Sequence, residues 1–337
     1  MYVDKDDCQE ETFFCPIFTN PGGVWKLIPI NRIFLNEDPE HEIALMAKID
    51  PPFRAVEIGF GNGEFLEHVA SANPEGVFFG IEVSLQCVMK TVKRIQNSGC
   101  ENARVLLGDA RFLLGECFPP EWLHSVYMNF PCPWPKTRHA KRRVTCSGFT
   151  EVLAGSLVKG GIFELLTDDR IYAEEVARVI PAHPALVMEK MYLNPERDIQ
   201  TKYERKWREQ GKEIFLLRFR KNTPFFSGRR KREEEELHSN IERQCPTLAR
   251  IQSLAGIERG EQSCRWVFKE SYMSSSGVML LESITSDEGF RQSFFIRIVP
   301  RKNGCLVKMD APSRPFRTPA VVMAFEKLVE DLRDETI

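Results

Sequence analysis

The sequence predicts a doubly wound, mostly parallel α/β domain followed by a small α+β domain. From residue 54, short runs rich in Val, Ile, Phe and Leu alternate with segments whose apolar residues recur at helical spacing. Strands that alternate with helices form a parallel sheet covered on both faces, as in Rossmann-like folds. After residue 245 the runs are mostly short strands separated by turn residues, which is typical of an antiparallel sheet.

The first domain is expected to contain at least five strands and three helices. The strands are RAVEIGFG (54–61), VFFGIEVS (77–84), ARVLLGDA (103–110), SVYMNFP (125–131) and GGIFELLTDD (160–169). The helices are EFLEHVASA (64–72), LQCVMKTVKRIQN (85–97) and GFTEVLAGSLVK (148–159). The strand runs are rich in β-branched and aromatic residues, and each helical run keeps an apolar face.

The second domain is expected to follow a polar, charged segment. Its strands are SCRWVFKESYM (263–273), GVMLLESIT (277–285), QSFFIRIVPRK (292–302) and GCLVKMDA (304–311). A helix over 318–335 follows, with Thr318 as its N-cap and Pro319 at its first position. We therefore divide the chain into an N-terminal extension (1–50), a first domain (51–221), a charged linker (222–245) and an accessory domain (246–337).

Composition and charge limit the function classes. Of 337 residues, 42% are hydrophobic and 28% are charged, as in an ordinary globular protein. No apolar run reaches about 18 residues, and the acidic start lacks the features of a signal peptide, so we expect a cytoplasmic protein with no membrane partner. The ten cysteines include no Cys-x-x-Cys pair, so we expect free thiols and no metal. With a net charge of −2, nucleic acid would bind through local basic patches.

A glycine-rich turn follows the first predicted strand. Ligands of open α/β sheets bind beyond the carboxyl ends of the strands, so a site is expected there. The segment EIGFGNGEF places Glu57 before Gly59, Gly61 and Gly63, and closely spaced glycines let a ligand approach the backbone. Glu64 stands where a dinucleotide fingerprint has its third glycine, which argues against an NAD-dependent oxidoreductase.

Acidic residues end the next two predicted strands. Glu82 lies 19 residues after Gly63, where its carboxylate can accept hydrogen bonds from both hydroxyls of a ribose. Asp109, in the segment GDA, can meet the edge of an adenine. With the glycine-rich turn, these acids predict an adenosine pocket, and the glycine spacing favours S-adenosylmethionine over NAD.

The fourth predicted strand ends in the segment NFPCPWPKTRHAKRR (129–143). Three prolines alternate with Cys132 and Trp134, and a series of basic residues follows without an acid. The end of this strand should face the methyl group of S-adenosylmethionine. The proline turn is therefore expected to shape the site that holds the methyl acceptor. The basic residues are expected to bind RNA phosphates. Trp134 can stack on a base or pack within the turn, and the sequence leaves both roles open.

Five segments together resemble bacterial tRNA (guanine-N7-)-methyltransferases, which modify the guanosine of the tRNA variable loop. They are EIGFGNGEFL, GIEVS, NFPCPWPKTRHAKRR, LLTDDRIYAEE and TKYERKW, in the family's order and spacing over roughly residues 50–220. The resemblance implies a class I methyltransferase fold, S-adenosylmethionine as cofactor, tRNA as substrate and 7-methylguanosine as product.

The resemblance also implies roles for particular residues. Those that would contact S-adenosylmethionine are Glu57, Gly59, Gly61, Gly63, Glu82, Asp109 and Ala110. Those that would contact tRNA are Lys136, Arg138, His139, Arg142, Arg143, Asp168, Thr201, Lys202, Tyr203 and Glu204, of which the last four match the family motif Thr-x-Tyr-Glu. Catalysis would involve Cys132 and Asp168.

One position departs from the family. Between the first two prolines of the turn the family has aspartate, and this chain has Cys132. Guanine N7 carries a lone pair and no proton, so methyl transfer to it needs alignment rather than a general base. A neutral thiol, however, neither stabilises the positive charge of the product nor offers the acceptor oxygens of a carboxylate.

Three alternatives follow from Cys132. In the preferred one, the enzyme works at a reduced rate, with Asp168 or Asp169 supplying negative charge. In the others, it methylates another substrate, or it binds S-adenosylmethionine and RNA with weak or no turnover. The accessory domain is left open between an auxiliary RNA surface, a structural role and dimerisation; its basic residues include Arg265, Lys269, Arg297, Arg301 and Lys302. The oligomeric state is also left open.

Overall fold

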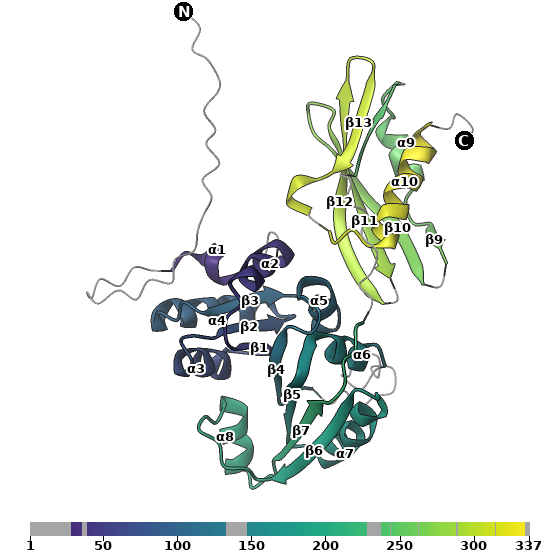
Figure 1. Ribbon diagram of the computed structural model, residues 1–337. Coiled ribbons are helices and arrows are strands. Elements are labelled where there is room, and N and C mark those ends of the chain that lie inside the picture. Colours follow the sequence, from purple (N-terminus) through teal and green to yellow (C-terminus); the bar gives the residue numbers. More distant parts are fainter. Residues whose placement is uncertain are drawn as a thin grey trace, which may run out of the picture.

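A computed structural model of the chain describes residues 28–35, 39–132, 147–227, 237–242, 244–261, 263–287, 289–313 and 315–333. These residues form two units, each built on its own β-sheet with its own hydrophobic core (Figure 1). None of the described helices combines the length and hydropathy that crossing a membrane would require.

The first unit is a seven-stranded sheet in the order β3-β2-β1-β4-β5-β7-β6. Only β7 runs antiparallel to its neighbours; the other strand pairs are parallel. The strands are β1 (Arg54–Ile58), β2 (Val77–Glu82), β3 (Ala103–Leu107), β4 (Leu123–Asn129), β5 (Leu157–Thr167), β6 (Leu186–Leu193) and β7 (Phe215–Lys221). This mostly parallel sheet confirms the predicted fold class.

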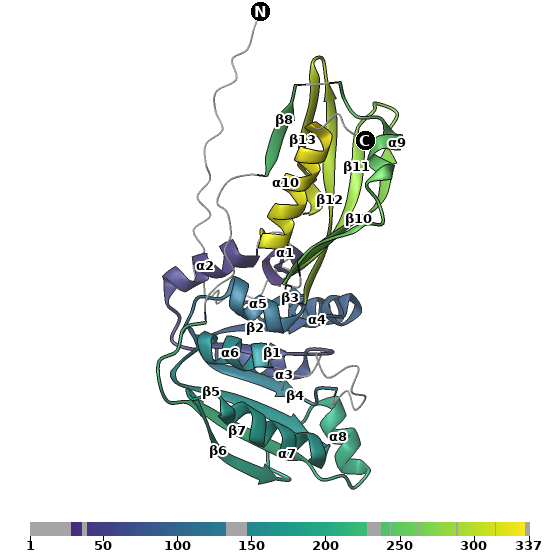
Figure 2. The same cartoon turned by 90° about the vertical axis from the view of Figure 1, so that its right-hand side faces the viewer.

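Helices cover both faces of the first sheet (Figures 1 and 2). Because successive strand residues point to opposite faces, Phe78 and Phe79 of β2 belong to two different core clusters. The helices are α1 (Ile30–Ile33), α2 (Pro39–Ile49), α3 (Glu64–Ala72), α4 (Leu85–Ser98), α5 (Ala110–Cys117), α6 (Ser147–Ser156), α7 (Arg170–Val179), η2 (Ile180–Ala182) and α8 (Lys202–Glu209). The predicted strands and helices thus occur where expected, with bounds that differ by a few residues. For example, β5 begins at Leu157 rather than at 160, because Leu157 already pairs with Leu123.

A buried lysine ends the first sheet. The side chain of Lys221, the last residue of β7, has no exposed surface. Its Nζ donates to Glu121 Oε1 (2.7 Å) and to the carbonyl oxygens of Leu157 (2.8 Å) and Phe225 (3.2 Å). These three acceptors match the three protons of the ammonium group, so the charge is buried without an unsatisfied donor.

The second unit is a six-stranded antiparallel sheet in the order β8-β13-β12-β11-β10-β9. Its elements are β8 (His238–Ile241), α9 (Leu248–Ser253), β9 (Glu258–Gly260), β10 (Cys264–Met273), β11 (Met279–Asp287), β12 (Phe290–Arg301), β13 (Gly304–Met309), η3 (Ala311–Ser313) and α10 (Pro319–Arg333). β8 lies within the segment 222–245 that we expected to be a linker, so part of that segment joins the second sheet. The units touch where Phe112 of α5 stacks on Phe290 of β12, with ring centroids 4.6 Å apart.

A carboxylate from the sheet caps helix α10. Asp287, at the end of β11, accepts the N–H of Ala320 with Oδ1 (2.8 Å). Its Oδ2 accepts a hydrogen bond from the hydroxyl of Thr318 (2.5 Å). The hydroxyl of Thr318, the predicted N-cap, therefore donates to Asp287 and does not accept from the helix. A carboxylate is a stronger acceptor than a hydroxyl at a helix N-terminus.

Candidate active site

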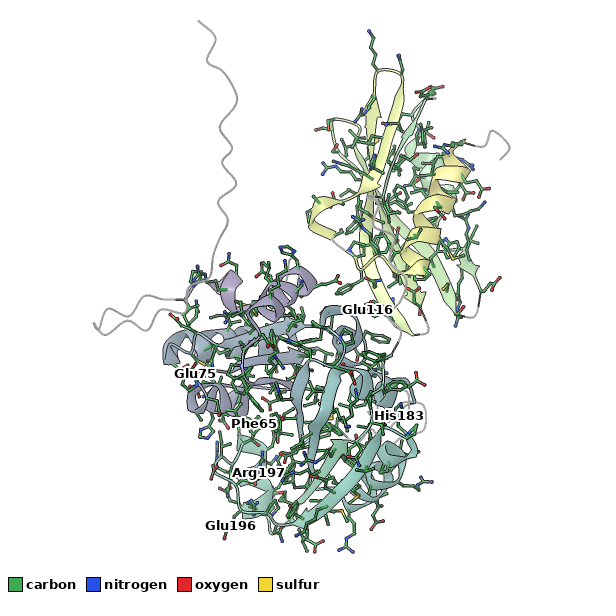
Figure 3. All side chains as sticks on the ribbon, in the orientation of Figure 1. Phe65, Glu75, Glu116, His183, Glu196 and Arg197 are labelled. Carbon is green, nitrogen blue, oxygen red and sulfur yellow. The ribbon has the colours of Figure 1, made fainter. Side chains whose placement is uncertain are left out.

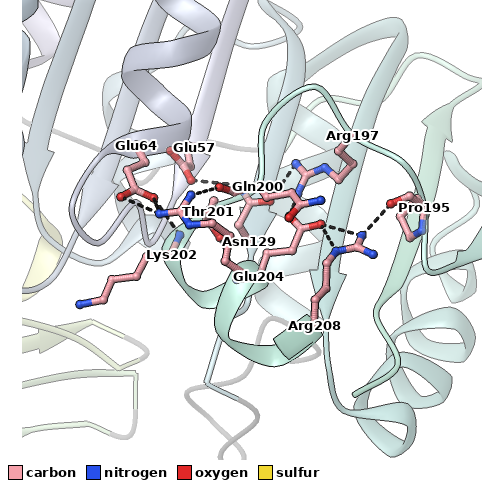
Figure 4. A network of polar contacts seen from close by, with 11 residues as sticks. Glu57, Glu64, Asn129, Pro195, Arg197, Gln200, Thr201, Lys202, Glu204 and Arg208 are labelled. Atoms are coloured by element: carbon pink, nitrogen blue, oxygen red, sulfur yellow. Dashed lines mark hydrogen bonds and ion pairs between the residues drawn. The ribbon is translucent and has the colours of Figure 1, made fainter. Parts of the chain in front are cut away.

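The strand order of the first sheet reverses between β1 and β4. In open α/β sheets ligands bind in the crevice at this point, beyond the carboxyl ends of the strands. Here two side chains from these strand ends meet: Asn129 of β4 donates from Nδ2 to Glu57 Oε1 of β1 (3.0 Å; Figure 4). The two residues are 72 positions apart in the sequence, and the sheet alone brings them together.

Glu57 is a buried carboxyl group, 3% exposed. Burial raises the pKa of Glu57 to about 7, and the hydrogen bond from Asn129 acts in the opposite direction. Its Oε2 is buried without a hydrogen-bond partner among the described residues. A buried acceptor without a donor is costly, so this oxygen is a place where a ligand donor would be favourable.

The glycine-rich turn has left-handed backbone at each glycine, with φ of 71° at Gly59, 57° at Gly61 and 73° at Gly63. At Gly63 an added Cβ would lie 2.4 Å from Cγ2 of Thr91 on α4, so this glycine lets α3 and α4 pack closely. At Gly59 and Gly61 an added Cβ would meet no atom within 4 Å. Those two positions therefore border open space, as a turn that receives a ligand should.

The two predicted acids at the next strand ends accept hydrogen bonds from nearby backbone groups. Glu82 Oε1 accepts the N–H groups of Val83 (2.8 Å) and Ser84 (3.0 Å), and its Oε2 accepts that of Gly61 (3.2 Å). Asp109 caps α5 by accepting the N–H of Arg111 (3.0 Å) and also pairs with that guanidinium. Ala110, the first residue of α5, is buried. All of these residues lie along the carboxyl edge of the sheet.

Arg197 is a site residue that the sequence did not reveal. It lies between β6 and α8, with its guanidinium over the ring of Phe65 at 5.4 Å from the centroid (Figure 3). Its Nη2 donates to Asn129 Oδ1 (3.3 Å), and its Nη1 pairs with Glu204 Oε2 (2.9 Å). Both ends of the Asn129 amide are therefore bonded, one to Glu57 and one to Arg197, which fixes its orientation.

Glu204 of α8 is fully buried. Besides Arg197, it pairs with Arg208 one turn later (2.8 Å), and Arg208 also donates to the carbonyl oxygen of Pro195 (2.6 Å; Figure 4). A side chain with no exposed surface does not meet a bound tRNA directly. We therefore interpret Glu204 as the residue that positions Arg197, in place of the substrate contact that the family motif implied.

The other residues of the motif Thr-x-Tyr-Glu begin helix α8. The hydroxyl of Thr201 accepts the N–H of Glu204 (3.3 Å) and so caps the helix. The N–H of Lys202 donates to Glu64 Oε2 (2.8 Å), which ties α8 to the start of α3. Tyr203 is 57% exposed, so its ring is accessible from solvent. Lys202 and Tyr203 are thus available to a substrate in a way that Glu204 is not.

The acids that follow β5 already have partners. Asp168 pairs with Nζ of Lys212 (2.5 Å), and Asp169 caps α7 by accepting the N–H of Tyr172 (3.0 Å). Cys132 is exposed and follows β4 by three residues. The five predicted RNA-binding residues of the basic segment lie outside the described residues: Lys136, Arg138, His139, Arg142 and Arg143.

The turn that follows β4 is conformationally unusual. Phe130 has a φ of 51°, a left-handed conformation that large side chains rarely adopt, and it immediately precedes Pro131. Its N–H donates to the carbonyl oxygen of Leu166 in β5 (2.7 Å), which holds the turn against the sheet. Such strain persists only where the surrounding structure imposes it, and it is frequent at functional sites.

Comparisons with known proteins agree with this geometry. Residues 53–217 match the model of a family described as "Putative methyltransferase". The chain is 37% identical over 278 residues to a tRNA (guanine-N(7)-)-methyltransferase of Thermotoga maritima, covering 82% of this chain and 88% of that one. It is 30% identical to the enzyme of that name from Aquifex aeolicus, covering 80% and 91%. Among solved structures, a 16S rRNA (adenine(1408)-N(1))-methyltransferase from Catenulisporales acidiphilia is 17% identical, with a TM-score of 0.42 and coverage of 57% and 94%.

The match to the Thermotoga protein reaches beyond the first sheet. The alignment has 278 residues, and the first sheet ends at residue 221 with β7. The alignment must therefore include part of the second unit. Part of that unit is therefore shared with at least one relative.

Proposed function

The chain belongs to the tRNA (guanine-N(7)-)-methyltransferase family, and we propose that it transfers a methyl group from S-adenosylmethionine to N7 of a guanosine in the variable loop of tRNA. The observation that carries this proposal is the meeting of the glycine-rich turn, Glu57 and Asn129 where the strand order reverses. The activity after which the two relatives are named supports it. Because its substrate would be tRNA, we propose the cytoplasm as its compartment.

The residues at the carboxyl edge of the sheet fit S-adenosylmethionine. Glu57 Oε2 has no hydrogen-bond donor within the part of the chain that the structure describes, and the described atoms leave the space beside Gly59 and Gly61 open. We propose that these residues bind it together with Gly63, Glu82, Asp109 and Ala110. When bound, S-adenosylmethionine supplies an electrophilic methyl group on a sulfonium.

The acceptor side of the crevice acts by orientation. Guanine N7 needs no general base, so a wall that holds the base in line supplies most of what the reaction requires. Asn129 is fixed at both ends of its amide, and the strained turn at Phe130 is held by β5. We propose that this turn, including Cys132, forms that wall, and that the exposed Lys202 and Tyr203 contact the tRNA.

RNA affinity would come mainly from contacts with phosphates. We propose that these contacts involve Thr201 at the start of α8 and the basic segment after the proline turn: Lys136, Arg138, His139, Arg142 and Arg143. Such binding weakens as the salt concentration is raised. The protein displaces counterions from the RNA when it binds, and a higher salt concentration opposes their release. Asp168 is a carboxylate that would repel a phosphate, so we propose that it contacts the tRNA by accepting a hydrogen bond from a base or a ribose hydroxyl.

A specific observation favours a second candidate, binding of cofactor and tRNA with slow turnover. The product guanine is cationic, and Cys132 offers no carboxylate for it. Asp168 is already paired with Lys212, and Asp169 caps α7, so neither carboxylate is a free counter-charge. In this candidate the fold and the ligands are the same, and only the rate differs.

The experiment is methyl transfer to unmodified tRNA transcripts with labelled S-adenosylmethionine, followed by nucleoside analysis by mass spectrometry. We expect 7-methylguanosine from a variable-loop guanosine, and no label in a transcript in which that guanosine is replaced by adenosine. Label in any other nucleoside would overturn the assignment. Binding of both ligands without label would favour the second candidate.

A further inference from the structure

Among the described residues, helices cover only one face of the second sheet. Helix α10 lies along that face (Figure 2), and it packs with α9 on a core that includes Phe268, Leu281 and Phe294. Along β11 buried residues alternate with partly exposed ones, so Leu280 and Ile284 point to the other side. We call that side the open face; its members include Arg265, Tyr272, Leu280, Arg291, Phe295, Arg297 and Lys308.

One row of the open face crosses four strands. The register pairs Tyr272 with Leu280, Leu280 with Arg297, and Arg297 with Lys308. Directly opposed residues of antiparallel strands share a face, so these side chains form a line from β10 to β13. The line begins with an aromatic ring and ends with two cations.

The aromatic part of the row is accessible. Tyr272 is 54% exposed, and its ring meets that of Phe295 edge to face, with centroids 6.2 Å apart. Phe295 itself is only half-buried on an otherwise open surface. Exposed aromatic rings on a sheet surface can stack with nucleic-acid bases, because every base has a π-face.

The open face carries more basic than acidic side chains. Five of its residues are basic (Arg265, Arg291, Arg297, Arg301 and Lys308), and three carboxylates lie on it or pair with it (Glu258, Glu282 and Asp310), a net charge of +2. Arg265 is paired with Glu258 (3.0 Å) and Arg297 with Asp310 (3.2 Å). Arg291 and Lys308 are exposed and have no ion-pair partner among the described residues. These two unpaired cations favour an anionic partner for the open face.

We propose that the open face binds the tRNA that the first unit methylates, with Arg291 and Lys308 at phosphates and Tyr272 stacked on an unpaired base. This proposal rests on the proposed function for the identity of the RNA. A second copy of the chain fits the face less well, because a twofold contact brings the same residues together and would set one basic row against another.

The first test measures binding of unmodified tRNA by the full-length protein over a range of salt concentrations, without cofactor. The double variant Arg291→Ala, Lys308→Ala should bind about tenfold more weakly at low salt. The slope of log affinity against log salt should fall by about 1–2, because two phosphate contacts are lost. Lys327→Ala is the matched control, since it removes one positive charge from α10 on the covered side and should leave both values unchanged. An unchanged slope in the double variant would overturn the proposal.

The second test isolates stacking. Tyr272→Ala should weaken tRNA binding about fivefold or more, and Tyr272→Phe should stay within about twofold of the wild type, because the ring and not the hydroxyl stacks. Equal loss in both variants would contradict stacking. Circular dichroism and thermal melting of each variant identify any loss of fold, which Tyr272→Phe is not expected to cause.

Methyl transfer and sedimentation of the same proteins separate the remaining outcomes. If the wild type forms 7-methylguanosine but every variant binds tRNA equally well, the open face is not an RNA site and the proposed function stands. If no methylguanosine forms and the variants still lose tRNA affinity, the proposed function fails and the open face stands. If a variant converts a dimer to a monomer at unchanged tRNA affinity, the face is a protein interface and the proposal is overturned.

Discussion

The two halves of the first sheet hold their polar groups in different ways. At the ends of β2 and β3, Glu82 and Asp109 accept hydrogen bonds mostly from backbone groups one or two residues away, and Glu82 also accepts the N–H of Gly61, 21 residues earlier. In the segment between β6 and α8, Arg197 reaches back 68 residues to Asn129 at the end of β4. We call these the cofactor half and the acceptor half. The first is held mainly by contacts close in the sequence, whereas the second depends on contacts between distant segments.

The difference predicts how far the effect of a substitution should extend in each half. A bond to a neighbouring N–H is a helix cap or a turn, and its loss remains local. The acceptor half is a chain of buried charges, Glu204, Arg197 and Arg208, in which the loss of one partner leaves the others unpaired. The acceptor half should therefore be the more sensitive to substitution.

The largest effect is expected from Glu204→Ala. It leaves two arginines, with side chains 12% and 26% exposed, without their carboxylate. Stability should fall by about 3–5 kcal/mol in urea unfolding, and methyl transfer should fall even where the variant remains folded. Glu209→Ala removes an exposed carboxylate from the same helix and should cost less than about 0.5 kcal/mol. Similar losses of stability in both variants would contradict the greater sensitivity that we assign to the acceptor half.

Glu57 lies between the two halves, and its titration should appear in the pH dependence of the unfolding free energy. Its folded pKa of about 7 lies above the ordinary 4.5, so its contribution to stability is complete below pH 4.5 and is lost as the pH rises through 7. The loss approaches about 3 kcal/mol at high pH. Glu57→Gln stays neutral and can still accept from Asn129, so its unfolding free energy should depend less on pH and should exceed that of the wild type above pH 8. Parallel pH profiles for the two proteins would rule out this assignment.

Cys132→Asp tests the acceptor half without removing a buried contact, because Cys132 is exposed. A carboxylate near the cationic product should raise the rate of methyl transfer about tenfold, equivalent to about 1.4 kcal/mol of barrier. Single-turnover rates with saturating tRNA measure this step. Cys132→Ser is the neutral control and should not reproduce the gain. A slower Cys132→Asp enzyme would mean that the chain has adapted its chemistry to the thiol.

The smallest effect is expected in the cofactor half. Asp109→Ala removes the cap of α5 and should cost about 1 kcal/mol in thermal unfolding. Asp109→Asn keeps a capping oxygen and should retain most of that stability. A loss above about 3 kcal/mol in Asp109→Ala would show that this half is as interdependent as the other.

The same contrast explains what the sequence could predict. The strands β1 to β5, the glycine-rich turn and the acids after β2 and β3 all follow from short-range patterns, and the structure has them where expected. Gly63 has a role that the pattern did not predict: the spacing predicted the approach of a ligand, whereas it is Thr91 of α4 that lies against this glycine. The family resemblance was likewise confirmed by the comparisons.

Residues whose role depends on distant partners could not be predicted in this way. Arg197 stands in the unremarkable segment NPERD, and it has two acceptors because the fold brings this segment to Asn129 and to Glu204. Glu204 matched a motif for substrate contact, yet the structure buries it completely. Thr318 was expected to cap α10 with its hydroxyl, but a carboxylate from β11 competes for the helix N-terminus. Sequence spacing carries no information on such competition.

The buried ammonium at the end of β7 bears on how this protein tolerates insertions. Lys221 binds the carbonyl oxygen of Phe225, and the N–H of Phe225 in turn donates to Glu121 (3.4 Å), so the four residues after the strand are fastened to the first unit. A peptide inserted between 221 and 225 would have to break this anchor, whereas one inserted after 225 would not. Ser227 also packs closely on Gly155 of α6, so the permissive point for grafting, exchanging or lengthening the connection to the second unit lies after residue 227, several residues later than the end of the strand suggests.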